Sequence, residues 1–164
     1  MILKFIGNKR LIDFFYIFLI FALDRISKIF VLNLSEKYSQ LELYQSSFIN
    51  IFLIWNKGIA FGLLSFERNS LYNLITVLIL VIILILFVLV FKSEKLKKMS
   101  YIFITGGAIG NLFDRIVYNS VPDFIDVHFR EFHWFIFNIA DIFITIGVIC
   151  LIFDEIILER KRYD

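Results

Sequence analysis

The sequence predicts an all-α integral membrane protein, a bundle of four transmembrane helices with a small extracytoplasmic β-cradle. Of its 164 residues, 60% are hydrophobic, above the about 45–50% typical of soluble domains. Four apolar segments approach the about 20 residues that cross a bilayer core. Basic residues are also unevenly distributed among the segments that connect them. One membrane-embedded domain over residues 1–164 is expected.

The four helices are expected over roughly residues 11–31, 70–91, 101–118 and 137–158. Lys4, Lys9 and Arg10 precede the first, as in a signal sequence. Its apolar stretch is too long for a signal peptide and no cleavage site follows, which indicates an uncleaved membrane helix. The second segment carries no charge between Arg68 and Lys92. The other segments carry ionisable residues inside apolar runs, and these require an explanation.

The basic residues predict the orientation. Ten of the 17 lysines and arginines precede the first helix, link the second to the third, or follow the fourth. These groups lie on one side if there are four crossings, so both termini are expected to be cytoplasmic. The segments 32–69 and 119–136 then lie outside.

The first outer segment has the pattern of a short sheet. Residues 48–54 form a β-prone apolar run, and the sequence Trp55-Asn56-Lys57-Gly58 supplies a turn signal. A second apolar run follows from Ile59 to Leu64. A strand pair or cradle is therefore expected within residues 38–66, while the second outer segment is expected to be a loop.

Composition excludes several other functions. A net charge of +2 is too balanced to indicate nucleic acid as a partner, and the single Cys150 rules out an intramolecular disulfide. Metal-ligand spacings such as HExxH are absent around the two histidines. No metal or cofactor is therefore expected, and the polar residues of the second outer loop are expected to be solvated or interfacial: Asp123, Asp126, His128, Glu131 and His133.

Two segments repeat one pattern, Asn111-Leu112-Phe113-Asp114 and Asn138-Ile139-Ala140-Asp141. Residues three apart share a helix face, and a carboxylate among lipid-facing residues is costly and usually functional. At a rise of about 1.5 Å per residue, Asp114, Asp141 and Asp24 all fall roughly 21–28 Å above the cytoplasmic boundary. Acids from three helices therefore reach the outer third of the bilayer.

Two carboxylates held a few ångströms apart cannot both ionise easily, so they share a proton. One can accept a proton from water while the other donates to a carbonyl oxygen, as amide hydrolysis without a cofactor requires. Asp114 and Asp141 are the predicted catalytic pair. The alternatives are polar contacts between helices, a proton-coupled transporter or channel, a noncatalytic scaffold, and an aspartyl protease of transmembrane helices, whose typical Gly-x-Gly-Asp is absent.

Other polar residues have expected supporting roles. Arg115 is expected to anchor a headgroup phosphate or a substrate carbonyl, or to be a snorkelling interfacial arginine. Asp24 and Lys28 are four apart and can pair on the first helix. Gly106 and Gly110 form a small-residue face that permits close helix contact.

The ordered set of motifs resembles lipoprotein signal peptidase, also called signal peptidase II. The resemblance rests on the segments 24–28, 56–61, 106–115, 121–124 and 137–141. It implies a bacterial inner-membrane aspartyl endopeptidase that cuts prolipoproteins just before a diacylglyceryl-modified cysteine, needs no cofactor and binds globomycin-type inhibitors. A monomer among membrane lipids is expected, because four helices around one site suffice. The implied catalytic pair is Asp114 and Asp141, with supporting positions at Asn111, Arg115, Asn138, Asn56, Gly58, Asp24 and Lys28.

Three positions depart from the family pattern. The family often has Gln where Arg25 stands, Gly where Asn119 stands and Pro where Phe135 stands. None of the three is expected to touch the acid pair.

Overall fold

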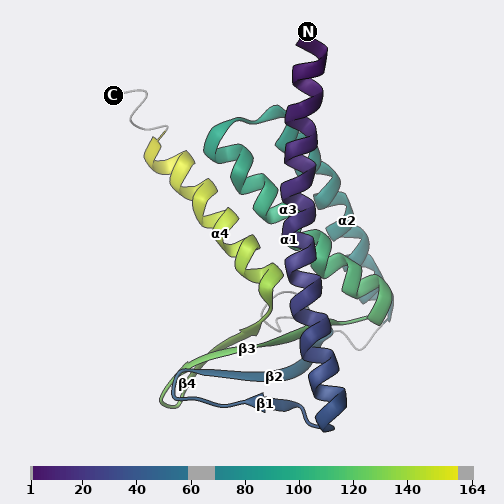
Figure 1. The fold of residues 1–164 in the computed structure, drawn as a ribbon, viewed down its shortest axis with the longest axis vertical. Coiled ribbons are helices and arrows are strands. Elements are labelled where there is room, and N and C mark those ends of the chain that lie inside the picture. The colour runs from purple at the N-terminus through teal and green to yellow at the C-terminus, as the bar shows by residue number, and fades with distance from the viewer. Residues whose placement is uncertain (1, 59–68, 159–164) are drawn as a thin grey trace.

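The computed structural model describes residues 2–58 and 69–158, which form four helices and one antiparallel sheet (Figure 1). The helices are α1 (Ile2–Tyr38), α2 (Asn69–Lys92), α3 (Lys95–Tyr118) and α4 (Ile139–Phe153), and a π-helical turn, Asp154–Leu158, extends α4. The strands are β1 (Glu42–Tyr44), β2 (Ile49–Asn56), β3 (Val121–Phe129) and β4 (Phe132–Phe137).

The four expected helices are present with shifted ends. The first is longer at both ends than predicted, because its helix continues through the basic N-terminal residues and beyond the apolar stretch. The third begins six residues early, at Lys95, and the fourth begins at Ile139 after a capping residue. Average hydropathy does not detect these polar helix ends.

The sheet differs more from the prediction. The four strands are hydrogen-bonded in the order β1-β2-β3-β4, all antiparallel. Within the described residues, β2 pairs with β1 and β3; the second apolar run expected as its partner lies outside them. The expected loop 119–136 is instead a β3–β4 hairpin, because Val121–Phe129 pairs antiparallel with Phe132–Phe137.

Helix α3 is the centre of the bundle, since it contacts α1, α2 and α4. Its glycines explain the close approach. A Cβ on Gly106 would lie 2.8 Å from the Ile20 Cβ of α1, and one on Gly107 would lie 2.5 Å from the Ala140 oxygen of α4. A Cβ on Gly110 would collide with Asp24. The predicted role of Gly106 and Gly110 in helix packing is confirmed.

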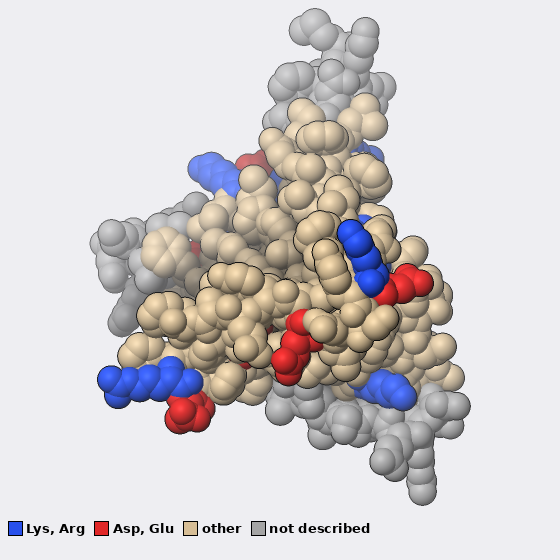
Figure 2. Space-filling model, turned by 60° about the horizontal axis from the view of Figure 1, so that its bottom comes forward, with Lys and Arg blue, Asp and Glu red and all other residues tan. Residues whose placement is uncertain are grey.

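The sheet lies at one end of the bundle, beside the C-terminal end of α1; the N-terminal end of α1 and the C-terminal end of α4 lie at the other (Figure 1). Val31 of α1, Leu53 of β2 and Phe124 of β3 form a buried cluster that attaches the sheet to the bundle. Figure 2 shows that uncharged side chains cover most of this end, with isolated acidic and basic residues among them.

The outward surfaces of all four helices are apolar. Leu11, Leu74, Ile116 and Ile149, one on each helix, are between 59% and 67% exposed. Of the described helices, one segment, Tyr72–Lys92, is long and apolar enough to cross a membrane on composition alone. Charged residues lower the mean hydropathy of α1 and α3, so these helices do not meet that criterion. The arrangement of four membrane spans therefore stays a prediction.

We predict that Gly107→Ala lowers the melting temperature of the protein in detergent micelles, at a cost of about 1–3 kcal/mol, because the new methyl group overpacks the α3–α4 contact. The matched control is Ile116→Ala, on the exposed face of the same helix. Equal melting temperatures for the two variants would contradict the packing argument.

Candidate active site

Polar side chains are buried where α1, α3, α4 and the sheet meet. Each has no more than 9% of its surface exposed. Seven of them are site residues predicted from sequence: Asp24, Lys28, Asn111, Asp114, Arg115, Asn138 and Asp141. Two, Arg25 and Asp123, were not predicted as site residues. Burial of so many charges requires that each be paired or hydrogen-bonded. The hydrogen bonds divide the group into an ion cluster and a pair of acids.

The ion cluster joins α1 to α3. Lys28 Nζ lies 2.9 Å from Asp24 Oδ2 and 2.7 Å from Asp114 Oδ2. Arg25 lies 3.0 Å from Asp24 and 2.6 Å from Asp114 Oδ1. Two carboxylates are therefore balanced by two cations in a low-dielectric interior. The predicted Asp24–Lys28 pair is confirmed, but the expectation that Arg25 stays away from the proposed acids is wrong.

These ion pairs give Asp114 partners that the sequence did not predict. Its carboxylate is held by both a lysine and an arginine, and breaking such a buried ion pair is strongly destabilising. The geometry therefore favours Asp114 as a counter-ion that holds the bundle together.

Asn111 connects the ion cluster to Asp141. Its Oδ1 accepts from Lys28 Nζ at 2.9 Å, and its Nδ2 donates to Asp141 Oδ1 at 2.8 Å. A single amide thus orients Asp141 with respect to Lys28. The first Asn-x-x-Asp motif does lie on one buried helix face, as predicted.

The second Asn-x-x-Asp motif has a different structure from the first. Asn138 is not helical; its extended backbone caps α4, and its side chain accepts from the Asp141 amide at 3.1 Å. The Asp141 carboxylate accepts from the Asn138 backbone at 3.2 Å, which completes a capping box. Asp141 therefore sits in the first turn of α4, where the helix dipole favours negative charge.

Asp123 is a buried acid that the sequence analysis placed in a solvated or interfacial position. It is 3% exposed, not solvated, and lies on β3. Asn56 donates to its Oδ2 at 2.8 Å and Asn138 donates to its Oδ1 at 2.6 Å. Asn138 therefore hydrogen-bonds both Asp123 and Asp141. An acid flanked on both sides by apolar residues of a strand was the signal that could have identified it.

The electrostatics of Asp123 suit proton exchange. Burial, and secondly the negative charge of Asp141, raise the pKa of Asp123 to about 7, against the lowering effect of the Asn56 and Asn138 hydrogen bonds. Asp123 thus exchanges its proton near neutral pH, as an acid/base catalyst must.

Arg115 and Gly58 position the end of β2. Arg115 Nη2 donates to the Gly58 carbonyl at 2.9 Å and Nη1 to the Asn111 carbonyl at 3.2 Å. The Gly58 amide in turn donates to Asn56 Oδ1 at 2.8 Å. Because Arg115 is 5% exposed, it is not a snorkelling arginine. It holds the turn that presents Asn56 to Asp123.

An apolar cavity of about 300 Å³ opens beside Asp141. It lies between β4 and α4, and its lining residues are Trp134, Phe135, Phe137, Asp141, Ile142, Thr145 and Ile146. Asp141 is the one acid among these lining residues, and most of the others are apolar. Such a cavity suits an apolar ligand that carries a single reactive polar group.

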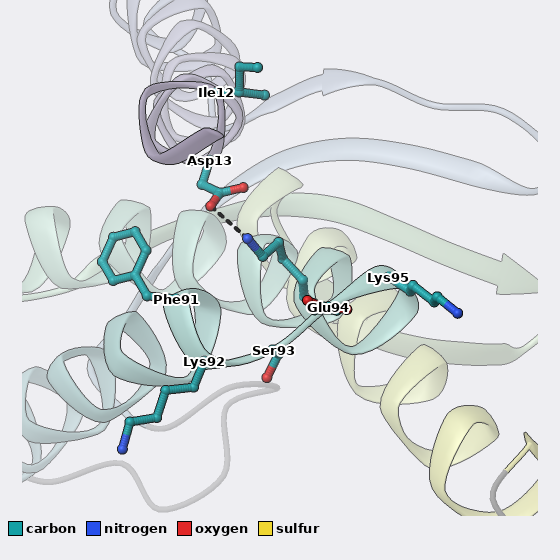
Figure 3. Close-up of a pocket in the computed structure, with 8 residues that line it drawn as sticks. Ile12, Asp13, Phe91, Lys92, Ser93, Glu94 and Lys95 are labelled. Atoms are coloured by element: carbon teal, nitrogen blue, oxygen red, sulfur yellow. Dashed lines mark hydrogen bonds and ion pairs between the residues drawn. The ribbon is translucent and has the colours of Figure 1, made fainter. Parts of the chain in front are cut away.

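A second cavity, of about 460 Å³, lies near the opposite end of the bundle, where α2 turns into α3. Figure 3 shows Asp13 at one side of this cavity, with Lys92 and Lys95 directed away from it. Asp13 and Lys98 are 2.9 Å apart. None of the predicted site residues lines this cavity.

Solved structures define the class of this fold. Two bacterial membrane enzymes, solved at 2.3 Å and 1.9 Å, match with TM-scores of 0.67. The first is 27% identical and the match covers 85% of this chain and 84% of that one. The second is 26% identical, and the match covers 88% of this chain and 92% of that one. The fold is that of a bacterial membrane enzyme.

The sequence comparisons give the family. Residues 16–157 match the model of signal peptidase (SPase) II. The lipoprotein signal peptidase of Pelagibacter ubique is 48% identical over 146 residues, which are 89% of this chain and 88% of that protein. The lipoprotein signal peptidase of Anaplasma phagocytophilum is 37% identical over 159 residues, which are 94% of this chain and 96% of that protein. The chain belongs to the signal peptidase II family and is a protease. Membership implies an inner-membrane protein and leaves the transporter and scaffold alternatives without support.

We predict that Lys28→Met costs about 3–5 kcal/mol of stability, because it leaves Asp24 and Asp114 buried with one cation between them. Thermal unfolding in detergent micelles measures the effect. Lys37→Met, at an exposed lysine on the same helix, is the control and should unfold as the unmodified protein does. A small effect at Lys28, similar to that at Lys37, would contradict the ion cluster.

Proposed function

We propose that this protein is an aspartic endopeptidase that hydrolyses prolipoproteins immediately before a diacylglyceryl-modified cysteine, with Asp123 and Asp141 as its acid/base pair. The observation that carries the proposal is the shared amide: the Asn138 side chain donates to Asp123 and accepts from the Asp141 backbone. Family membership supports the substrate, since the relatives are named lipoprotein signal peptidases.

This proposed pair differs from the Asp114–Asp141 pair expected from sequence. Asp114 is bound by Lys28 and Arg25, whereas Asp123 receives its hydrogen bonds from neutral amides. Because its hydrogen-bond donors are neutral amides, Asp123 can give up or accept a proton without breaking an ion pair, whereas Asp114 cannot. Asp114 instead fixes Lys28, which reaches Asp141 through Asn111.

In the proposed reaction, both carboxylates assist the attack of one water molecule on the scissile peptide bond. Ionised Asp141, favoured by its position at the start of α4, accepts a proton from the attacking water. Protonated Asp123 donates its proton to the scissile carbonyl oxygen as the tetrahedral intermediate forms. The intermediate then collapses: Asp123 takes the proton back from the hydroxyl group, the C–N bond breaks, and Asp141 gives its proton to the leaving amine nitrogen. Apolar walls strengthen these charge effects by excluding bulk water.

The apolar cavity beside Asp141 suits the rest of the substrate. Its aromatic and aliphatic lining can accept lipid chains or the apolar signal peptide, while the peptide bond reaches the acids. We further propose four membrane spans, with both termini cytoplasmic, the acids near the periplasmic face, and a monomer as the working unit. A globomycin-type inhibitor would occupy the same cavity.

We predict that Asp123→Asn and Asp141→Asn each lower the cleavage rate by about 10²–10⁴-fold, the range for loss of a general acid or base. The assay is purified protein with a lipidated prolipoprotein, with and without globomycin, and with an unlipidated substrate that should stay uncut. Each variant turns one hydrogen-bond acceptor into a donor, so each loses one buried hydrogen bond, and its melting temperature should fall by less than that of Lys28→Met.

Asp114→Asn is the discriminating variant. It should lower the melting temperature, because it leaves Arg25 and Lys28 with less opposing charge. If it abolished cleavage at an unchanged melting temperature while Asp123→Asn cleaved normally, Asp114 and Asp141 would be the pair and the present assignment would be wrong.

We also predict that cleavage falls as pH rises above about 7, because ionisation of Asp123 removes the proton donor. Asn56→Ala removes a hydrogen bond that favours the ionised form, so it should move this decline to higher pH. Asn50→Ala is the matched control: it is on the same strand, but its amide binds Asp126. If cleavage declined at the same pH in the unmodified protein and in both variants, Asp123 would not be the group that sets that pH.

A further inference from the structure

Three side chains at the tip of the β3–β4 hairpin converge on one face of the sheet. Asp126 and His128 are two residues apart on β3, so they share a face. His133 on β4 is directly opposite His128 in the register. The two imidazole rings stack with their centroids 4.9 Å apart and their planes inclined by 19°. Antiparallel pairing therefore assembles a cluster that sequence spacing did not predict.

The cluster has dimensions close to those of a tetrahedral metal site. Asp126 Oδ2 lies 2.9 Å from His133 Nδ1 and 3.7 Å from His128 Nδ1. One ligand atom from each residue can be chosen so that all lie within 4.8 Å of one another. Bonds of about 2.0–2.1 Å to tetrahedral zinc place ligand atoms about 3.3 Å apart. Small side-chain rotations would therefore bring the three atoms to bonding distance.

Buried polar atoms at this position lack partners. Asp126 is 1% exposed, and neither its Oδ1 nor His128 Nδ1 has a hydrogen bond. A buried group of this kind needs an explanation, and a bound ion is one. Asn50 on β2 donates to Asp126 Oδ2 at 3.1 Å. This hydrogen bond orients the carboxylate, as outer residues commonly do around metal ligands.

We propose that Asp126, His128 and His133 bind a divalent transition metal ion of the zinc type on the sheet. Two imidazole nitrogens and one carboxylate oxygen suit such an ion, whereas calcium and magnesium favour oxygen ligands. The fourth position is left for water or for Glu42, which lines the adjacent cavity of about 130 Å³ together with Asn50, Asp126 and His133. The ion would bind β4 to β3, the strand that carries Asp123.

The test uses the full-length protein in detergent micelles after treatment with a chelator. Titration with Zn²⁺ should show one saturable site per chain by calorimetry. Co²⁺ should give the visible absorption of a tetrahedral site, and Zn²⁺ should displace it. The chain has two histidines, both in this cluster, so any imidazole coordination comes from it.

Variants assign the ligands. His133→Asn and His128→Asn should each weaken Zn²⁺ binding by at least about 100-fold, and Asn50→Ala by about 10–100-fold, the effect expected of a residue that orients a ligand. Glu131→Gln, at an exposed carboxylate of the same hairpin, should bind normally. Absence of saturable Zn²⁺ binding by the unmodified protein would overturn the proposal, as would undiminished binding by either histidine variant. No readout depends on cleavage, so failure here leaves the proposed peptidase function untouched.

Discussion

The ion cluster of Asp24, Arg25, Lys28 and Asp114 is the interaction on which the site depends. It joins α1 to α3 through charges that have almost no contact with solvent. Asp24 extends it to a third helix, because its Oδ1 accepts from the Ala140 amide at the start of α4 at 3.0 Å. Removal of any member leaves a buried charge without its partner, which costs far more than loss of an exposed salt bridge.

The sheet supplies one of the two proposed catalytic acids. Asp141 comes from a helix, whereas Asp123 and its donor Asn56 come from two neighbouring strands. Asn138 lies at the junction, as the end of the β4–α4 connection and the cap of the helix. The proposed acid pair therefore forms only when hairpin, cap and bundle are assembled together, and Arg115 secures the same junction from the side of β2.

The sequence predicted the number of helices, the inward position of the acids and the Asp24–Lys28 pair, because each depends on local periodicity and hydropathy. It did not predict the partners of Asp114, since no pattern places Arg25, 89 residues away, against it. Asp123 was assigned to a solvated loop because acids within a strand resemble surface residues until the covering elements are known. The histidine cluster was missed for a similar reason: cross-strand pairing, not spacing along the chain, brings its members together.

The position of Arg25 limits which substitutions the bundle can accept. With Arg25 the four buried groups carry two positive and two negative charges, which sum to zero. A neutral side chain at this position would leave one negative charge uncompensated in a low-dielectric interior. Exchange of Arg25 is therefore expected to be tolerated only together with a second substitution that restores the balance.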